Sequence, residues 1–273
     1  MACDSWPKFV CCRWKLFQPP AELRNQIVNG EEVSFGETLR ATNMKKILLA
    51  FLLVSFTVFV FAKEDRTDAT DRLSASAKVL DELMGTPDNS IPETVLAKAK
   101  CVAVIPSMVK GGFVVGGRHG RGVVTCRTPH GWSAPAFLSL NGGSWGAQIG
   151  VEKVDLVLLF MNDKGVNSLL KDNFKMGADA SVAAGPIGRH AEASTDAKLD
   201  SEILAYSRAK GLFAGVELNG AAVKPDNDST NAFYGTTVNW KELLSGNVKA
   251  PAGSDPFLDA VHKYFVEARA ASK

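Results

Sequence analysis

The stretch GGFVVGGRHGRG, residues 111–122, places six glycines and two arginines around a short apolar run. Such a stretch is either a phosphate-binding loop or a strand whose glycines serve the geometry of a sheet. A dinucleotide-binding loop follows the pattern G-x-G-x-x-G, but Thr125 stands where the third glycine after Gly120 and Gly122 would fall. A Walker loop contains Gly-Lys, a pair that occurs nowhere in the chain. The surrounding sequence must therefore decide between the two interpretations.

The region around this stretch contains short apolar runs of the kind that form β-strands. It begins with CVAVIP at residues 101–106, and further runs span residues 113–115, 123–126, 136–140, 146–151 and 156–161. Turn residues separate these runs at positions 129–131, 141–142 and 162–165. The run DLVLLFM, residues 155–161, is apolar on both faces, which is typical of a central strand. Strand-like segments follow at residues 178–188 and 203–220, where Asn219-Gly220 favours a hairpin turn.

Helical periodicity is found at both ends of this β-rich region. From Asp65 to Met84 the apolar residues recur at helical spacing, and Gly85 ends the run. The predicted amphipathic helix either packs on a core or contacts a membrane surface. Shorter helices are predicted at residues 92–100 and 166–170.

The last predicted helix starts with Asp255 as its cap and Pro256 as its first residue. One face of it carries the apolar residues Leu258, Val261, Phe265 and Ala268. Helices at both ends of many antiparallel strands indicate an α+β fold. We expect a single domain at residues 63–273, with a twisted sheet or barrel-like core between N-terminal and C-terminal helices.

The N-terminal part of the chain has the pattern of an export signal. Two lysines and an apolar run precede Val60-Phe61-Ala62, which resembles a small-residue cleavage site. Residues 44–62 are therefore predicted to be a secretory signal peptide. A membrane anchor is the alternative. The 43 residues upstream are unusual for such a signal. We interpret residues 1–43 as an extension that is disordered or not translated, with Met44 as the true start. We expect the protein to be exported and to be periplasmic, secreted or peripheral on a membrane.

Of the five cysteines in the chain, two lie in the predicted mature part, Cys101 and Cys126. Their spacing does not resemble that of a zinc site. An oxidising compartment would permit one disulfide between them, and two small buried apolar side chains are an equally good interpretation. No metal and no cofactor is predicted.

Charge is distributed unevenly although residues 63–273 carry as many acidic as basic side chains. Between Glu93 and Glu152 there is no acid, while this segment contains Lys98, Lys100, Lys110, Arg118, Arg121 and Arg127. A segment of one sign in a neutral protein indicates an anionic partner, such as phosphate head groups, or a solvated face whose lysines prevent edge pairing. Nucleic acid is not expected, because the net charge is low and the signal directs the chain elsewhere.

Four segments together resemble the SYLF domain family. They are AVIPSMVKGGFVVGGRHGRGVV (103–124), GWSAPAFLSLNGGSWGAQIGVEKVDLVLLFMN (131–162), KMGADASVAAGPIGR (175–189) and AYSRAKGLFAGVELNG (205–220). Members of this family are lipid-binding modules, and eukaryotic relatives bind phosphoinositides and regulate actin assembly at membranes. The resemblance therefore implies a non-enzymatic lipid-binding protein that recognises anionic phospholipids or a membrane surface. An actin-regulator-like protein interaction module, with an unknown protein partner, is an alternative.

The resemblance also implies that the glycine-rich stretch is part of a sheet. Arg118 and Arg121 project from a segment with little side-chain bulk, which suits bidentate contact with a phosphate. Phe113 is a candidate for an apolar contact beside them or for the core. The predicted lipid-binding residues are Lys100, Lys110, Phe113, Arg118, Arg121 and Arg127.

A serine hydrolase is the enzymatic alternative. Gly142-Gly143-Ser144-Trp145-Gly146 satisfies G-x-S-x-G, which requires a strand before the serine and a helix after it. The residues after Ser144 continue as a strand pattern, so a hairpin serine is the better interpretation. His119, His130, His190 and His262 are scattered and indicate neither a catalytic triad nor a metal site. We expect no enzyme activity and assign no catalytic residue.

Overall fold

The computed structural model describes residues 65–86, 90–112, 115–145, 150–187, 201–209 and 218–271. These residues all belong to one unit, Lys63–Lys273. The predicted signal at residues 44–62, the extension at residues 1–43 and Phe113 lie outside the described residues.

In the described part of the chain, nine strands form one curled sheet. Its four longest strands are antiparallel neighbours in the order β4 (Ala136–Trp145), β2 (Val115–Thr128), β1 (Cys101–Gly112) and β5 (Gly150–Phe160). Beyond β4 lie β9 (Ala222–Pro225) and β6 (Phe174–Lys175), and beyond β5 lie β8 (Ile203–Ala209) and the parallel β7 (Val182–Ala184). The short β3 (Gly131–Trp132) pairs with β2.

Two of the predicted turns are wrong. Asn141 and Gly142 lie inside β4, opposite His119 and Arg118 of β2, because pairing along the whole strand outweighs the local turn preference. At residues 162–165 the chain enters a helix instead, since the Asn162 side chain accepts a hydrogen bond from the Gly165 amide at 3.0 Å and caps α6 (Asp163–Leu169). The strands are consequently longer than the short runs that the sequence predicts.

The turn at Asn219-Gly220 is confirmed, with Gly220 at a φ of 76°. The strand that follows, β9, pairs with β4 and β6 and not with β8. Among the described residues, the expected hairpin with the preceding strand is therefore absent.

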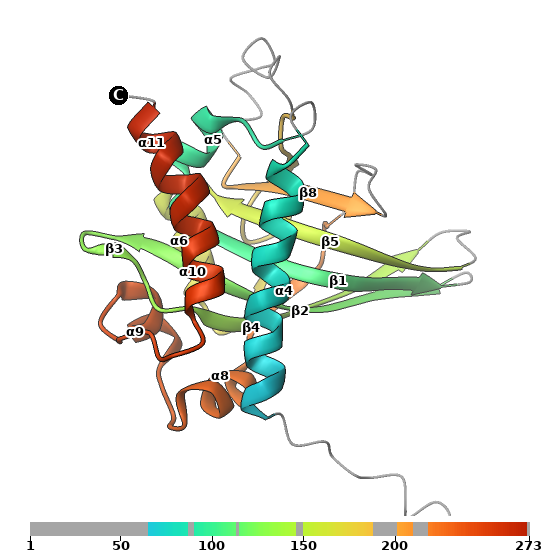
Figure 1. Cartoon of the computed structure of the whole chain (residues 1–273). Helices are drawn as coiled ribbons and strands as arrows, with labels where there is room; N and C mark the ends of the chain where they lie inside the picture. The colour runs from blue at the N-terminus through green and yellow to red at the C-terminus, as the bar shows by residue number, and fades with distance from the viewer. Residues whose placement is uncertain are drawn as a thin grey trace, which may run out of the picture. The chain divides into compact units, whose positions relative to one another are not determined.

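One face of the sheet is covered by helices from both ends of the domain (Figure 1). These are α4 (Arg66–Met84), α5 (Glu93–Lys98) and a C-terminal helix that runs as α10 (Asp255–Val261), the π-helical η2 (His262–Val266) and α11 (Glu267–Ala271). Their apolar faces enclose Val102, Val104, Phe137, Val157 and Leu159 of the sheet. The predicted helices at both ends are confirmed, and the cap of the last one is Ser254, one residue earlier than expected.

A second core lies on the other face of the sheet. It includes Ile105, Leu138, Leu158 and Phe160, which pack with residues of α6 and of α9 (Trp240–Ser245). Residues Leu156 to Phe160 of β5 are buried on both faces, so the predicted central strand is confirmed. Another short helix, α8 (Asn227–Tyr234), packs against α4. None of the described helices has the length and hydrophobicity needed to span a membrane.

The described part of the glycine-rich stretch forms the end of β1 and the first part of β2, and packing requires two of the glycines in β2. A Cβ built on Gly122 would lie 2.3 Å from the Val104 carbonyl oxygen. A Cβ on Gly120 would lie 2.5 Å from Ile105 Cγ2. Side chains at both positions would therefore collide with β1, so these glycines let two central strands approach closely.

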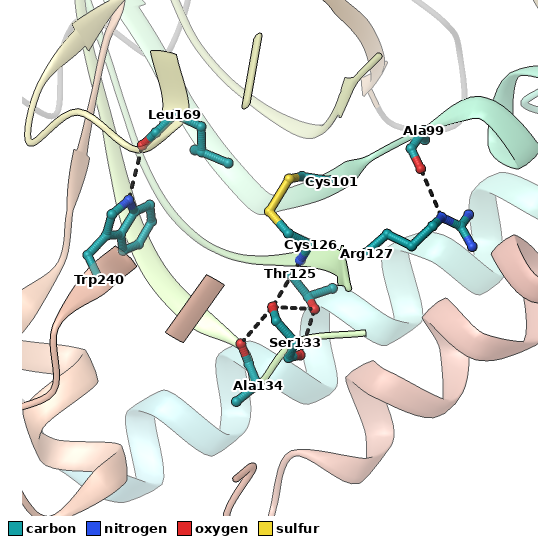
Figure 2. Close-up of a disulfide and its surroundings, with 9 residues drawn as sticks. All are labelled: Ala99, Cys101, Thr125, Cys126, Arg127, Ser133, Ala134, Leu169 and Trp240. Carbon is teal, nitrogen blue, oxygen red and sulfur yellow. Dashed lines mark hydrogen bonds between the residues drawn. A yellow bond between two sulfur atoms is a disulfide. The ribbon is translucent and has the colours of Figure 1, made fainter. Parts of the chain in front are cut away.

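A disulfide joins Cys101 and Cys126, which stand directly opposite each other in β1 and β2 (Figure 2). The sequence alone leaves open whether these two cysteines form a disulfide, and the structure shows that they do. Both cysteines are buried, at 0% and 4% exposure. A cross-link over 25 residues contributes about 3 kcal/mol to stability.

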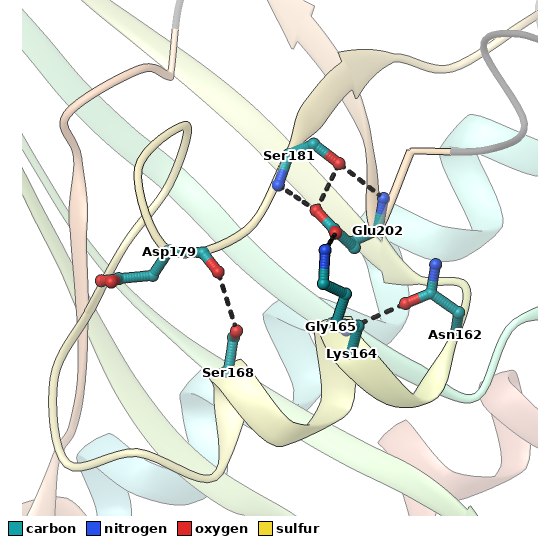
Figure 3. A network of polar contacts seen from close by, with 7 residues as sticks. All are labelled: Asn162, Lys164, Gly165, Ser168, Asp179, Ser181 and Glu202. Atoms are coloured by element: carbon teal, nitrogen blue, oxygen red, sulfur yellow. Dashed lines mark hydrogen bonds and ion pairs between the residues drawn. The ribbon is translucent and has the colours of Figure 1, made fainter.

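Glu202 connects three segments near the β7 end of the sheet (Figure 3). Its carboxylate accepts hydrogen bonds from the Ser181 hydroxyl and amide and from Lys164 Nζ, the last at 2.9 Å. These bonds, chiefly the one from the Ser181 hydroxyl, lower the pKa of Glu202 from 4.5 to about 2.

We expect Glu202→Gln to lower the free energy of unfolding by about 2 kcal/mol, because an amide loses the charge-assisted bonds. The folded pKa lies below the unfolded one, so the wild-type stabilisation is present above pH 4.5 and lost as pH falls toward 2. Urea denaturation at pH 7 and at pH 3 checks this. The difference between the two proteins should shrink at pH 3, and an equal difference at both pH values would contradict the assignment.

Candidate binding surface at the glycine-rich end of the sheet

The structure does not bring together the five predicted lipid-binding residues that it describes. Lys110 and Arg118 are cross-strand neighbours on one side of the sheet, and Arg121 lies on the other side. Lys100 and Arg127 lie at the opposite end of the strands, next to the disulfide. Phe113 is outside the described residues. Their common role in lipid binding stays a prediction.

Lys100 and Arg127 have structural partners. Lys100 Nζ lies 2.6 Å from Asp163 Oδ1. The Arg127 guanidinium lies 4.6 Å from the Trp132 ring centroid and donates to the carbonyl oxygens of Ala99 and Phe265. Burial, together with the nearby Arg269, lowers the pKa of Arg127. Arg127 therefore connects the end of β2 to the helices.

Arg118 does not project from the sheet as expected, because it is 5% exposed. Its Nη2 donates to the Gly143 carbonyl oxygen at 3.2 Å. The opposite residue, Gly142, makes this possible, since a Cβ there would lie 3.0 Å from Arg118 Nε. The glycine thus leaves space for the arginine to lie against the strand.

On the helix-bearing side of the sheet, the strand ends extend past α4 and are not covered (Figure 1). We call this surface the basic sheet face and define it by the side chains of Val109, His119, Arg121, Asn141, Lys153 and Lys224. They come from five neighbouring strands, β5, β1, β2, β4 and β9. All six side chains are exposed to solvent. Five are polar or charged, and the sixth, Val109, is apolar and 38% exposed.

Register places these side chains in two rows. Lys153, Val109, His119 and Asn141 are successive cross-strand partners, and His119 Nδ1 lies 2.6 Å from Asn141 Oδ1. In the second row Ser139 separates Arg121 from Lys224. Because neighbouring strands are about 4.8 Å apart, each row is compact enough to contact one partner.

The row next to the first one, on the same side of the sheet, consists mostly of glycines among the described residues. Its positions are Val151, Gly111, Gly117 and Gly143, one from each of four adjacent strands. A Cβ at Gly143 would meet no atom within 4 Å, and one at Gly117 would meet only the Gly142 carbonyl, at 3.8 Å. Packing does not require glycine at these two positions, and an exposed backbone permits close approach by a partner.

The charge of the basic sheet face is positive. None of its six side chains is acidic, and the neighbouring Asp155 of β5 accepts hydrogen bonds from Arg208 at 3.0 Å and from the Ser107 amide at 2.9 Å. In the described part of the chain, Lys153 and Lys224 have no acidic partner within salt-bridge distance. An anionic surface is the complementary partner.

Sequence reasoning missed Lys153 and Lys224. The acid-free segment ends at Glu152, one residue before Lys153, and Lys224 lies far along the chain. The alternation of β5 was a usable signal, because it places Lys153 on the side of the sheet opposite to Glu152. No local signal places Lys224, since its position depends on the pairing of β9 with β4.

The context of a nucleophile elbow is not found at Ser144. This residue lies in β4 and pairs with Gly116, and the next described residues, from Gly150, form strand β5. A hydrolase elbow needs a helix after the serine. Within the described ranges there is also no group of three His, Cys, Asp or Glu residues that could hold a metal ion.

The fold and this surface define a class, an α+β domain with an exposed basic face on its sheet. Residues 141–264, from β4 to η2, match the family described as "Ysc84: Las17-binding protein actin regulator". This match confirms the predicted resemblance to the SYLF family.

Curated relatives agree with this assignment. The chain is 40% identical over 175 residues to Protein YSC84 of Saccharomyces cerevisiae, covering 63% of this chain and 37% of the yeast protein. It is 38% identical over 173 residues to yeast LAS seventeen-binding protein 3, covering 62% and 38% of the two chains. It is 34% identical over 180 residues to human SH3 domain-containing YSC84-like protein 1, covering 65% and 52%. The match thus spans between about a third and a half of these relatives, none of which is named as an enzyme.

Proposed function

We propose that this domain is a non-catalytic binding module that engages actin filaments through the basic sheet face. The observation that carries the proposal is the set of exposed basic side chains that β5, β2 and β9 place on one side of the sheet, beside an outer row of glycines. Such a surface complements an acidic protein surface and lets it approach the backbone.

The relatives support a protein partner. The matched family is described as an actin regulator, and the three relatives carry YSC84 or LAS seventeen binding in their names. The match covers less than half of each yeast protein. Binding of LAS seventeen belongs to the relative that is named for it and is not the proposal for this chain.

Cosedimentation of the full chain with actin filaments tests the proposal. Arg121→Glu combined with Lys153→Glu should weaken binding at least about tenfold, because two attractions become repulsions. Lys171→Glu combined with Lys249→Glu makes the same charge change at exposed positions outside the face and should bind like wild type. Equal loss in both variants, or no binding by wild type, would overturn the proposal.

An anionic membrane is a second candidate, and a specific observation favours it. Val151, at 77% exposure, and Val109 lie on the same side of the sheet as Arg121 and Lys153. Exposed apolar groups among cations suit the interface of an acidic bilayer, where each cation contributes about 1 kcal/mol. The same variants are therefore sedimented with vesicles of graded phosphatidylserine content. Binding to acidic vesicles without binding to filaments would select this candidate.

Export of the chain is a separate proposal that goes with the membrane candidate, because an exported chain does not meet the actin filaments in the cytoplasm of its own cell. The predicted signal at residues 44–62 supports it, as does the Cys101–Cys126 disulfide, since disulfides persist mainly in oxidising compartments. The N-terminus of the protein recovered outside the cytoplasm of its host should lie within about two residues of Lys63. Recovery of the mature chain from the cytoplasm alone would contradict it.

A further inference from the structure

A pocket of about 440 Å³ opens on the other face of the sheet, at the end where the disulfide lies. Its volume falls in the range of small-molecule sites, about 300–1,000 Å³. The two cysteines line it together with residues of α6 and α9. Neither the actin proposal nor the basic sheet face uses this pocket.

The pocket combines an apolar interior with cations. Val166 and Leu170 line it from α6 and its C-terminal cap, and Leu244 lines it from α9, beside the disulfide. Lys100 and Lys241 also line it. Lys100 forms an ion pair with Asp163, the one acid of the lining, whereas Lys241 has no acidic partner within salt-bridge distance among the described residues. Arg127 is a third cation of the lining, so the lining carries a net positive charge of two.

Two contacts hold the walls in place. Trp240 Nε1 donates to the Leu169 carbonyl oxygen at 3.0 Å and thus joins the start of α9 to the end of α6 (Figure 2). At the other end of α9, Gly246 has a φ of 83°, and a Cβ there would lie 2.8 Å from Thr128 Cγ2 of β2. Both helices are thereby fixed around the disulfide, so the pocket is formed before any ligand arrives.

We propose that this pocket binds a small aliphatic anion. The aliphatic chain packs on Val166, Leu170 and Leu244, and the anionic head group lies near Lys241. The chemistry follows from the lining, since apolar walls select an aliphatic body and an uncompensated cation selects an anion.

Isothermal titration calorimetry of the full chain with decanoate tests the proposal, with decyltrimethylammonium as the cation of similar chain length. Decanoate should bind and the ammonium should bind at least about tenfold more weakly. Lys241→Glu should reduce decanoate affinity about tenfold, while Lys249→Glu, the same change at an exposed lysine outside the pocket, should leave it unchanged.

A second measurement uses the disulfide. Bound decanoate should slow the reduction of Cys101–Cys126 by dithiothreitol in wild type and much less in Lys241→Glu, because both sulfur-bearing residues line the pocket. Equal binding of the anion and the cation, or no binding of decanoate, would overturn the proposal. Unchanged reduction in the presence of saturating decanoate would place the ligand elsewhere and would also overturn it.

Discussion

Replacement of Gly122 by alanine is expected to lower the free energy of unfolding by about 3 kcal/mol. The added Cβ would lie 2.3 Å from the Val104 carbonyl oxygen and 3.0 Å from Ile105 Cα. Both are backbone atoms of β1, so no side-chain rotation relieves the contact and the strand itself must shift. That shift would disturb the cores on both faces of the sheet.

Gly143→Ala provides the matched control. Gly143 lies in β4, pairs with Gly117 of β2, and has open space where the Cβ would be. Alanine is favoured over glycine within a strand by about 0.5–1 kcal/mol, so this variant should be as stable as wild type or slightly more stable. Urea denaturation followed by circular dichroism compares the variants. Equal stability of the two alanine variants would contradict the packing role of Gly122.

Arg72→Ala should lower the free energy of unfolding by about 4 kcal/mol. The arginine is 8% exposed, and its Nη1 donates to Ser229 Oγ at 2.8 Å and to Asp226 Oδ2 at 3.2 Å. Its guanidinium also lies 5.5 Å from the ring centroid of Phe137. Alanine would leave a cavity and remove the cation beside Asp226, where α4, α8 and the sheet meet.

Arg66→Ala serves as the control. Like Arg72, Arg66 lies over a phenylalanine ring, 5.6 Å from the centroid of Phe233, but its side chain is exposed. Its loss should cost less than about 1 kcal/mol. Thermal unfolding of both variants measures the difference. If Arg72→Ala is no less stable than Arg66→Ala, the buried contacts of Arg72 do not stabilise the folded state.

The helices and the central strand could be predicted from the sequence because their signals are local. Periodic apolar residues define α4, and a run that is apolar on both faces defines β5. The full length of β4 could not be predicted in this way. Asn141-Gly142 favours a turn by itself, and only pairing with His119 and Arg118 keeps it extended.

The candidate site was predictable only in part, because it depends on register. The basic segment correctly included Arg121 as an exposed side chain, but nothing near Arg118 in the sequence indicates that Gly142 of another strand makes room to bury it. Likewise, Cys101 and Cys126 form a disulfide because the β1–β2 register places them opposite each other. These outcomes follow from pairs of residues that are distant in the chain.

The central claim is that the basic sheet face is the surface on which the partner lies. Amine-reactive labelling of the wild-type chain, free and bound to actin filaments, followed by mass spectrometry, tests it without any substitution. Lys153 and Lys224 should become protected in the complex, while Lys171 and Lys249, exposed at positions outside this face, should be labelled as in the free protein. Protection of Lys171 and Lys249 with unchanged labelling of Lys153 and Lys224 would contradict the account.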